Sequence, residues 1–233
     1  TGVKSPMKKE IIENQALPSI DDLLGGSTGS LTIHPVRSEA GDLTEEEKIQ
    51  RIAARFRDIM STLGLDLTDE SLRDTPMRVA KMYVQEIFSG LNPANKPSPT
   101  LFDNAYRYNQ MLVERDIKLQ STCEHHFVPI LGHAHVAYIA KGKVIGLSKL
   151  NRIVDHFARR PQVQERLTVQ IAEELKRVLD TEDVAVIIDA EHLCVKARGI
   201  RDEHSSTLTS SYHGKFLNES TRLELLKYIE LGR

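Results

Sequence analysis

Apolar residues recur three or four positions apart along two stretches of the first half of the chain, as they do on a buried helix face. The first stretch runs from Thr44 to Gly64. Thr44 and the three glutamates after it suit a helix start, because they complement its free N–H groups. The second stretch begins at Asp74-Thr75-Pro76 and extends to about Phe88, before Ser89-Gly90. The sequence therefore predicts two helices at the start of the domain.

Farther along the chain the pattern changes to that of β-strands. Residues 92–109 are rich in Pro and Asn, which is typical of a loop. The strands that we expect after this loop lie at roughly 111–121, 127–139, 143–147, 184–196 and 207–216. The fourth of them is apolar at nearly every position in its first half, which indicates burial on both faces of a sheet.

Three more helices are predicted among and after these strands. Ser148 is expected to cap a helix that runs to about Ala158, and Pro161 to begin a second one. The closing helix is expected at about 220–231. The buried stripe of the middle helix is formed by Val163, Leu167, Ile171, Leu175 and Val178. Helices first, then antiparallel strands with a helix pair inserted, predict an α+β fold.

The length of 233 residues fits one domain and a tail. We interpret residues 1–42 as the tail, since its run at 25–30 is rich in Gly and Ser and its apolar residues are only weakly periodic. Residues 43–233 then form the domain. We expect its helical part at about 43–91 and its sheet part at about 110–233.

Composition and charge exclude several classes of function. A net charge of -2 gives no general attraction to nucleic acid or to an anionic membrane. The chain has no Trp and only 5% aromatic residues, which disfavours a platform for stacking single-stranded bases. It holds no apolar run of about 18 residues, so no membrane span is expected. We expect a cytoplasmic protein that binds neither nucleic acid nor membrane.

The two cysteines lie in two short motifs that also carry histidines. Cys123 and His126 are three residues apart, which suits a bend or a helical turn. His192 and Cys194 are two apart, so a strand would place both on one face. With His125, these residues offer enough donors for zinc with one open position, the arrangement of catalytic zinc sites. A disulfide and two buried small side chains are the alternatives, and the absence of a secretory signal disfavours the disulfide.

Cationic residues concentrate in a stretch of a slightly acidic chain. Seven Lys and Arg residues fall within 141–166, against Asp155 and Glu165. Lys149 and Arg152 are three apart at a predicted helix start, where free N–H groups also favour anions. Read without further context, they form a solvated basic helix face. Binding of an anion is the other interpretation, although the chain has no glycine-rich phosphate loop.

Four separated motifs together resemble those of the GTP cyclohydrolase I family. They are Cys123–His126, Gly146–Arg152, Arg160–Leu167 and His192–Gly199, in that order and at matching spacing. The resemblance runs from about Leu43 to the C-terminus. It implies the tunnelling fold, in which an antiparallel sheet packs against a helix pair, preceded here by the helical region.

The resemblance also implies a zinc centre with two catalytic histidines. It assigns Cys123, His126 and Cys194 to Zn²⁺, a choice between His125 and His126 that spacing leaves open. The ion would activate water for attack on C8 of guanine. His125 is then the expected acid at N7, and His192 a second proton carrier near the ribose.

Substrate contacts follow from the same resemblance. Glu165 would accept the N1–H and N2–H donors of guanine, with Gln164 beside it, although a Glu outside the buried stripe is usually just solvated. Arg78 and Lys81, three apart on the second predicted helix, read on pattern alone as a solvated stripe. The residues that the resemblance assigns to triphosphate are Ser148, Lys149, Arg152 and Arg198, together with Arg78 and Lys81 of a neighbouring subunit.

The implied reaction converts GTP and water into 7,8-dihydroneopterin triphosphate and formate, the first step of folate and pterin biosynthesis. The implied assembly is a homodecamer of two face-to-face pentamers, with each site shared between subunits. Two rival readings stay open. One is another purine- or pterin-handling enzyme of the same fold, disfavoured by the two cysteines paired with His126. The other is a non-catalytic nucleotide-binding protein with a structural zinc, disfavoured by the open ligand position and the free histidines.

Overall fold

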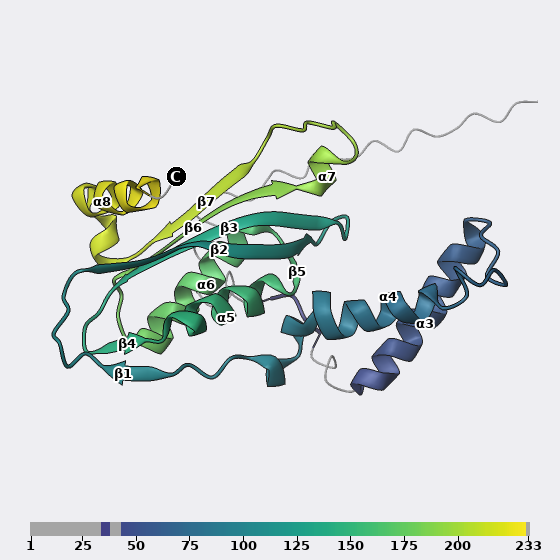
Figure 1. The fold of residues 1–233 in the computed structure, drawn as a ribbon, viewed down its shortest axis with the longest axis horizontal. Helices are drawn as coiled ribbons and strands as arrows, with labels where there is room; N and C mark the ends of the chain where they lie inside the picture. The colour runs from purple at the N-terminus through teal and green to yellow at the C-terminus, as the bar shows by residue number, and fades with distance from the viewer. Residues whose placement is uncertain (1–33, 38–42, 232–233) are drawn as a thin grey trace, which may run out of the picture. The chain divides into compact units, whose positions relative to one another are not determined.

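A five-stranded sheet forms the centre of the computed structural model, which describes residues 34–37 and 43–231 (Figure 1). Most of the predicted tail at 1–42 therefore lies outside the described residues, and the predicted domain boundaries stay predictions. The strands are β1 (Leu101–Asp103), β2 (Met111–Cys123), β3 (Pro129–Ile139), β4 (Lys143–Ile145), β5 (Pro161–Gln162), β6 (Val184–His192) and β7 (Thr207–Tyr212). The α-helices are α3 (Glu45–Thr62), α4 (Thr75–Lys81), α5 (Leu147–Ala158), α6 (Gln164–Leu179), α7 (Leu193–Lys196) and α8 (Glu219–Glu230).

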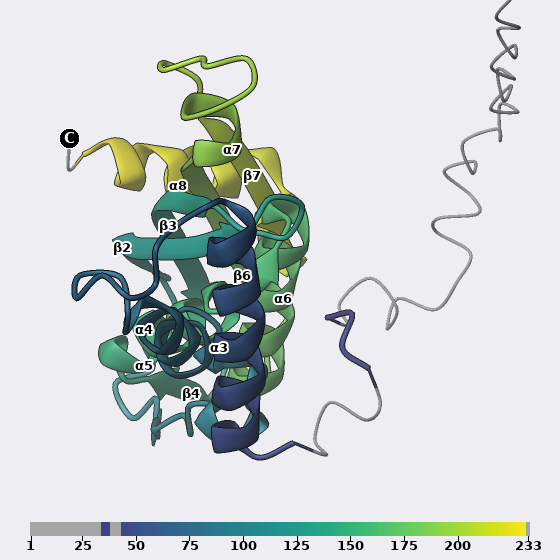
Figure 2. The ribbon, with the colours of Figure 1, turned by 90° about the vertical axis from the view of Figure 1, so that its right-hand side faces the viewer.

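The strand order of the sheet is β5-β2-β3-β6-β7. Its neighbours are antiparallel except for the short β5, which runs parallel to β2. Helices α5 and α6 cover one face, as Figures 1 and 2 show, and α8 packs on the other face at one end. The predicted α+β fold, an antiparallel sheet with a packed helix pair after a helical region, is confirmed. The parallel strand at its edge was not predicted.

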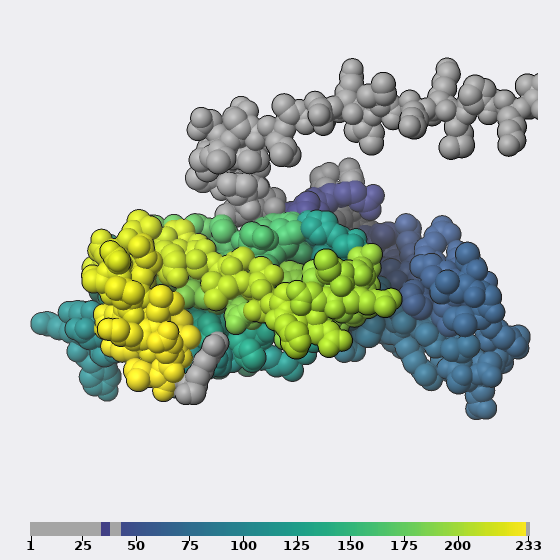
Figure 3. Space-filling model, turned by 90° about the horizontal axis from the view of Figure 1, so that it is seen from above, coloured from purple at the N-terminus to yellow at the C-terminus, as the bar shows by residue number. Residues whose placement is uncertain are grey.

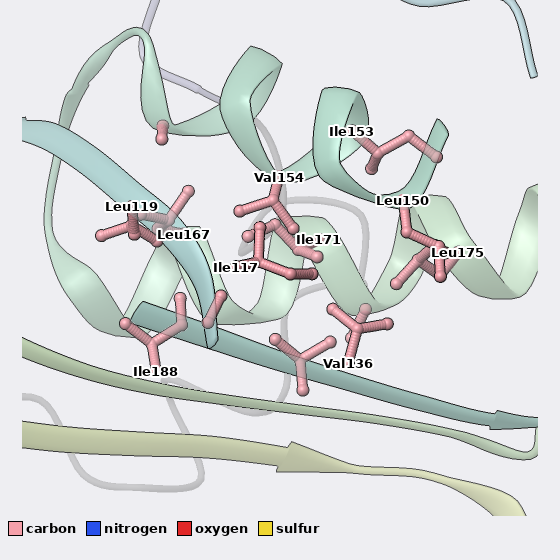
Figure 4. Close-up of a cluster of buried hydrophobic side chains, with 14 of the residues drawn as sticks. Ile117, Leu119, Val136, Leu150, Ile153, Val154, Leu167, Ile171, Leu175 and Ile188 are labelled. Atoms are coloured by element: carbon pink, nitrogen blue, oxygen red, sulfur yellow. The ribbon is translucent and has the colours of Figure 1, made fainter. Parts of the chain in front are cut away.

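The side chains of β6 alternate between the two faces of the sheet, and both faces are covered. Val186 and Ile188 belong to the main core beneath α5 and α6, whereas Ala185 and Ile187 belong to the smaller core beneath α8. Successive strand residues point to opposite faces, so a strand with both faces covered is apolar at every position. Figure 4 shows the main core, where Leu167 of α6 and Val154 of α5 face the strands. Burying one such side chain contributes about 1.5–3 kcal/mol.

The first two predicted helices form a hairpin with a small core of its own. Thr44 and Glu47 make a reciprocal capping box at the start of α3, which confirms the predicted helix start. Ile49, Ala53 and Ala80 form the buried contact between α3 and α4. The second predicted helix is α-helical only as far as Lys81 and continues as a π-helix, η2 (Met82–Ile87).

The stretch at 92–109, predicted as a loop, contains more structure than expected. It holds the short strand β1, which pairs with β4, and a 3₁₀ turn, η4 (Pro93–Asn95). Just before it, Gly90 donates its N–H to the carbonyl of Arg159 over 3.0 Å. A Cβ atom at Gly90 would lie 2.1 Å from the His156 carbonyl oxygen, so only glycine permits this close approach to the end of α5.

Four predicted boundaries are wrong. Strand β7 ends at Tyr212 rather than residue 216, because a 3₁₀ turn (Gly214–Leu217) follows it. Strand β6 ends at His192 rather than residue 196, because its partner β3 begins at Pro129, which has no N–H to continue the ladder. Pro161 begins β5 rather than a helix, because it pairs with β2. Ser148 lies inside α5, whose N-cap is Gly146.

No helix among the described residues is long and apolar enough to cross a membrane. In Figure 1, α8 and α7 lie at opposite ends of the sheet, and on the surface seen in Figure 3 the segment after α7, in yellow-green, lies between α8 in yellow and the helical region in blue. The end at α7 is also the end at which β2 and β6 deliver the two cysteine motifs. It is therefore the part of the sheet that concerns function.

A buried histidine at the end of α5 makes stability depend on pH. The Nε2 atom of His156 accepts a hydrogen bond from Arg160 over 2.7 Å, which requires a neutral imidazole. Burial and the nearby charges of Arg160 and Lys96 lower the pKa of His156 to about 4. Because the unfolded chain takes up this proton near pH 6.5, stability is complete above that pH and falls as pH drops towards 4.

We therefore expect the free energy of unfolding, measured in urea at fixed protein concentration, to fall by up to about 1.4 kcal/mol per pH unit between pH 6.5 and 4. The variant His156→Gln should show a shallower dependence over that range, although it is less stable at pH 7. An unchanged slope in this variant would show that other groups carry the dependence.

Candidate metal centre and substrate site

The first cysteine motif forms a tight turn at the end of β2. Cys123 is the last residue of that strand, and the chain turns over the next three residues before β3. The Cys123 N–H donates to the carbonyl of Val128, and the Phe127 N–H donates to the carbonyl of Cys123, each over 2.9 Å. Phe127 has a φ of 54°, an unfavourable left-handed conformation for a bulky residue. The predicted bend between Cys123 and His126 is confirmed.

The second cysteine motif reaches the first through helix α7. His192 is the last residue of β6 and pairs with Ile130 of β3, and Cys194 follows on the helical turn. The prediction that one strand carries both residues is therefore wrong. Among the described residues, Cys123, His126 and Cys194 nevertheless lie together: one donor atom of each lies within 4.8 Å of the other two. Strand pairing thus unites two motifs that are far apart in sequence.

This donor set fits a zinc ion. The distance from Cys123 Sγ to His126 Nδ1 is 3.8 Å. Two ligands of a tetrahedral zinc ion, one sulfur and one nitrogen, lie about 3.5 Å apart, so the side chains are close to the required spacing. Both cysteines are free thiols, Cys123 buried and Cys194 partly buried. Burial, with Cys123 beside it, raises the pKa of the Cys194 thiol, and a bound cation would reverse that effect.

His125 lies beside this set without belonging to it. Its Nδ1 atom is also 3.8 Å from Cys123 Sγ, but the group that includes Cys194 contains His126 instead. The His125 side chain is 64% exposed, and its Nε2 atom lies 4.0 Å from the Glu124 carboxylate. An accessible imidazole next to a metal centre can exchange protons with a bound molecule.

An ion pair that the sequence did not reveal supports the turn. Arg166 of α6 donates to the Glu124 carboxylate over 2.6 Å, and both side chains are partly buried. The Glu124 N–H also donates to the carbonyl of Gln162 in β5 over 3.0 Å. The residue between Cys123 and His125 is thereby fixed to the start of α6. Sequence signals for this pair were weak, because its members are 42 residues apart.

Helix α6 presents two adjacent polar residues in opposite ways. Glu165 is exposed, as its place outside the buried stripe predicted, and it acts electrostatically on His192. Gln164 is only 1% exposed, and its Oε1 atom lies 2.8 Å from His192 Nε2. Burial lowers the pKa of His192, and Glu165 opposes that effect. The side chain of Gln164, predicted as a substrate contact, is thus engaged inside the protein.

Some of the cationic residues bind other parts of the protein, and the others are the predicted phosphate contacts. Part of the predicted cluster serves the fold, since Arg159 pairs with Asp155 over 3.0 Å and Arg160 donates to the Gly90 carbonyl over 2.9 Å. Arg198 lies close enough to Cys194 to act on its thiol pKa. The remaining predicted phosphate contacts lie on two helices, with Ser148, Lys149 and Arg152 near the start of α5 and Arg78 and Lys81 on α4.

Comparison with known proteins identifies the family. The sequence model of GTP cyclohydrolase I matches residues 52–230, well over half of the chain. The chain belongs to the GTP cyclohydrolase I family. The GTP cyclohydrolase 1 of Flavobacterium johnsoniae is 56% identical over 212 residues, which cover 91% of this chain and 95% of that protein. The GTP cyclohydrolase 1 of Aeromonas salmonicida is 57% identical over 188 residues, covering 80% and 86%.

The resemblance seen in the sequence motifs is thereby confirmed. Both cysteine motifs, the first turn of α6 and the start of α5 fall within the residues that match the GTP cyclohydrolase I family. A solved structure of an archaeosine synthase, the QueF-like protein in its apo form, covers 49% of this chain and 94% of its own at a TM-score of 0.35 and 19% identity. That likeness is too distant to carry an argument.

Proposed function

We infer that this protein is a GTP cyclohydrolase I, which converts GTP into dihydroneopterin triphosphate and releases formate. Family membership across residues 52–230 supports the activity. The observation that carries it is the group formed by Cys123, His126 and Cys194, with the accessible His125 beside it. A set of three ligands leaves a position open, as catalytic zinc sites do.

We propose that Cys123, His126 and Cys194 hold Zn²⁺. When bound there, the ion would supply Lewis-acid activation of water near neutral pH for attack on C8 of guanine. The protein contributes the fixed placement of the three side chains. Cys123 is anchored by the β2–β3 turn and Cys194 by α7 at the end of β6.

The two remaining histidines are proposed to move protons. His125 would protonate N7 of the guanine imidazole ring, because its exposed side chain stands next to the metal ligands. His192 would serve as a second proton carrier near the ribose, during the opening and rearrangement of the sugar. The lowered pKa of His192 favours its neutral form, which can accept a proton.

Guanine recognition is proposed for Glu165. Guanine offers adjacent N1–H and N2–H donors on one edge, and a single carboxylate can accept both. Adenine does not offer that pair, and a site that depends on it can discriminate on the order of 10⁴-fold. The exposed Glu165 carboxylate is near enough to His192 to oppose the lowering of its pKa, which supports a place for the base on this side of α6.

The triphosphate is proposed to bind cationic residues from more than one subunit. Ser148, Lys149 and Arg152 would act at the start of α5, where helix N–H groups favour anions, together with Arg198. Arg78 and Lys81 on α4 would reach the site of a neighbouring subunit. The homodecamer of two pentamers and the cytoplasmic location stay predictions.

The experiment that tests this function is formate release. Zinc-loaded protein of confirmed assembly is incubated with GTP, with and without a zinc chelator, while formate and the dihydroneopterin chromophore are measured. We expect formate that disappears with the chelator and returns with added zinc. GTP recovered intact would contradict the activity and support a non-catalytic nucleotide-binding protein.

A further inference from the structure

The orientation of the buried Gln164 amide is determined by its surroundings. Its Nε2 atom donates to the carbonyl oxygens of Ile188 and Thr207, over 3.1 and 2.8 Å, and lies 3.1 Å from the Thr209 hydroxyl. Carbonyl oxygens only accept hydrogen bonds. Turning the amide over would place its own oxygen against both of them. The NH₂ group must therefore face β6 and β7, and the oxygen must face away.

This orientation determines which nitrogen of His192 carries a hydrogen. The Gln164 oxygen lies 2.8 Å from His192 Nε2. Since an amide oxygen only accepts, Nε2 must be the donor, and in the neutral ring the lone pair is then on Nδ1. The amide is buried to 1% exposure and held by groups from two strands, so the ring meets a fixed partner.

We propose that Gln164 is a positioning residue that holds the His192 ring in one orientation and in the Nε2–H tautomer, with the lone pair of the neutral ring on Nδ1. The role in turnover rests on the proposed function of His192. The tautomer itself rests only on the hydrogen bonds.

Gln164 and the neighbouring Glu165 face different surroundings, although they are adjacent on α6. Successive helix residues point about 100° apart, so Gln164 faces the sheet while Glu165 faces solvent. Gln164 therefore holds His192 by a hydrogen bond, and the exposed Glu165 can contact a bound base. Tautomer control by a hydrogen-bonded neighbour typically matters for histidines in enzymes, since the wrong tautomer presents a hydrogen where a lone pair is needed.

The first test measures the tautomer directly. Zinc-loaded full-length protein is labelled with ¹³C,¹⁵N-histidine and examined by solid-state NMR at pH 8, and the His192 signals are assigned by comparison with His192→Asn. We expect the protonated nitrogen to correlate with both Cε1 and Cδ2, which identifies it as Nε2. A proton on Nδ1, or an even mixture of tautomers, would overturn the proposal without the need for any Gln164 variant.

The second test separates positioning from stability and from base binding. Gln164→Met keeps the size of the side chain and loses its hydrogen bonds, so we expect kcat to fall about 10- to 100-fold with little change in KM for GTP. The matched control is Thr209→Val, which removes a partner of the Gln164 NH₂ group and leaves the bond to His192 intact. It should lose stability but keep kcat within about threefold and keep the Nε2–H tautomer.

Two outcomes would contradict the proposal. A rise in KM for GTP at unchanged kcat in Gln164→Met would show that Gln164 binds the substrate directly. Equal loss of kcat in Gln164→Met and Thr209→Val would show that only packing is involved. The proposed function fails separately, through the absence of formate from the wild-type protein, while the NMR result still decides the tautomer.

Discussion

Replacing His126 by alanine is expected to remove both zinc and formate release, whereas replacing His125 by alanine should leave zinc in place and remove formate release alone. The two imidazoles are adjacent, and each has its Nδ1 atom 3.8 Å from Cys123 Sγ. They differ because the group of donor atoms within 4.8 Å of one another contains Cys123, Cys194 and His126, but not His125. Loss of a ligand removes the ion and its activated water, while loss of a proton donor costs typically 10²- to 10⁴-fold in rate.

The measurement is zinc per subunit by elemental analysis, together with GTP affinity and formate release for each variant. Each histidine variant serves as the matched control of the other, because both remove one imidazole from the same turn. Zinc lost from His125→Ala but kept by His126→Ala would reverse the assignment of the ligand. Retained formate release in His125→Ala would remove that residue from the mechanism.

Replacing Glu165 by glutamine is expected to lower kcat/KM for GTP by about 10³- to 10⁴-fold. Glutamine has nearly the same size, but its NH₂ group would oppose a donor of the guanine edge, leaving two donors face to face. Activity towards inosine triphosphate, which lacks the N2 amine, should fall less. The ratio of kcat/KM between the two nucleotides measures this effect.

Glu173→Gln provides the control on the same helix. Glu173 lies farther along α6 and pairs with Lys176 over 3.2 Å, so its loss should change kcat/KM little. If Glu165→Gln behaves like Glu173→Gln, then Glu165 does not recognise the base.

Local patterns predicted the elements that depend on neighbours in sequence. The apolar stripe of α6 is buried at Leu167, Ile171, Leu175 and Val178. The capping box at Thr44 begins α3, and the closing helix α8 lies within a residue of its expected bounds. These features follow from helical periodicity and end effects, which a single stretch of sequence contains.

Features that depend on distant partners could not be predicted in this way. Strand β5 exists only because Pro161 and Gln162 meet the end of β2, and β6 stops where its partner begins with Pro129. The motifs named Cys123 and Cys194 as candidate ligands, but spacing gave no choice between His125 and His126. In the structure, donor atoms of Cys123, His126 and Cys194 lie within 4.8 Å of one another, which supports His126 as the ligand.

The buried position of the Gln164 side chain also could not be predicted from the sequence. Its sequence position beside Glu165 suggested that both residues meet the substrate, yet the Gln164 side chain is buried against β6 and β7, whereas Glu165 is exposed. A helix turns by about 100° per residue, so neighbours in sequence need not share a surface. Which of the two faced inward depended on the carbonyl oxygens of Ile188 and Thr207.

The pairing of β3 with β6 also sets the order of events during synthesis and folding. Cys123 and His126 lie at one end of the β2–β3 hairpin, which can form early because its strands are adjacent in sequence. Cys194 arrives only after β6 has paired with β3, a contact between residues farther apart in the chain. A nascent chain that ends before β6 thus offers two of the three proposed ligands. Tight zinc binding should accordingly appear late in folding, and it then stabilises the finished domain by mass action instead of nucleating it.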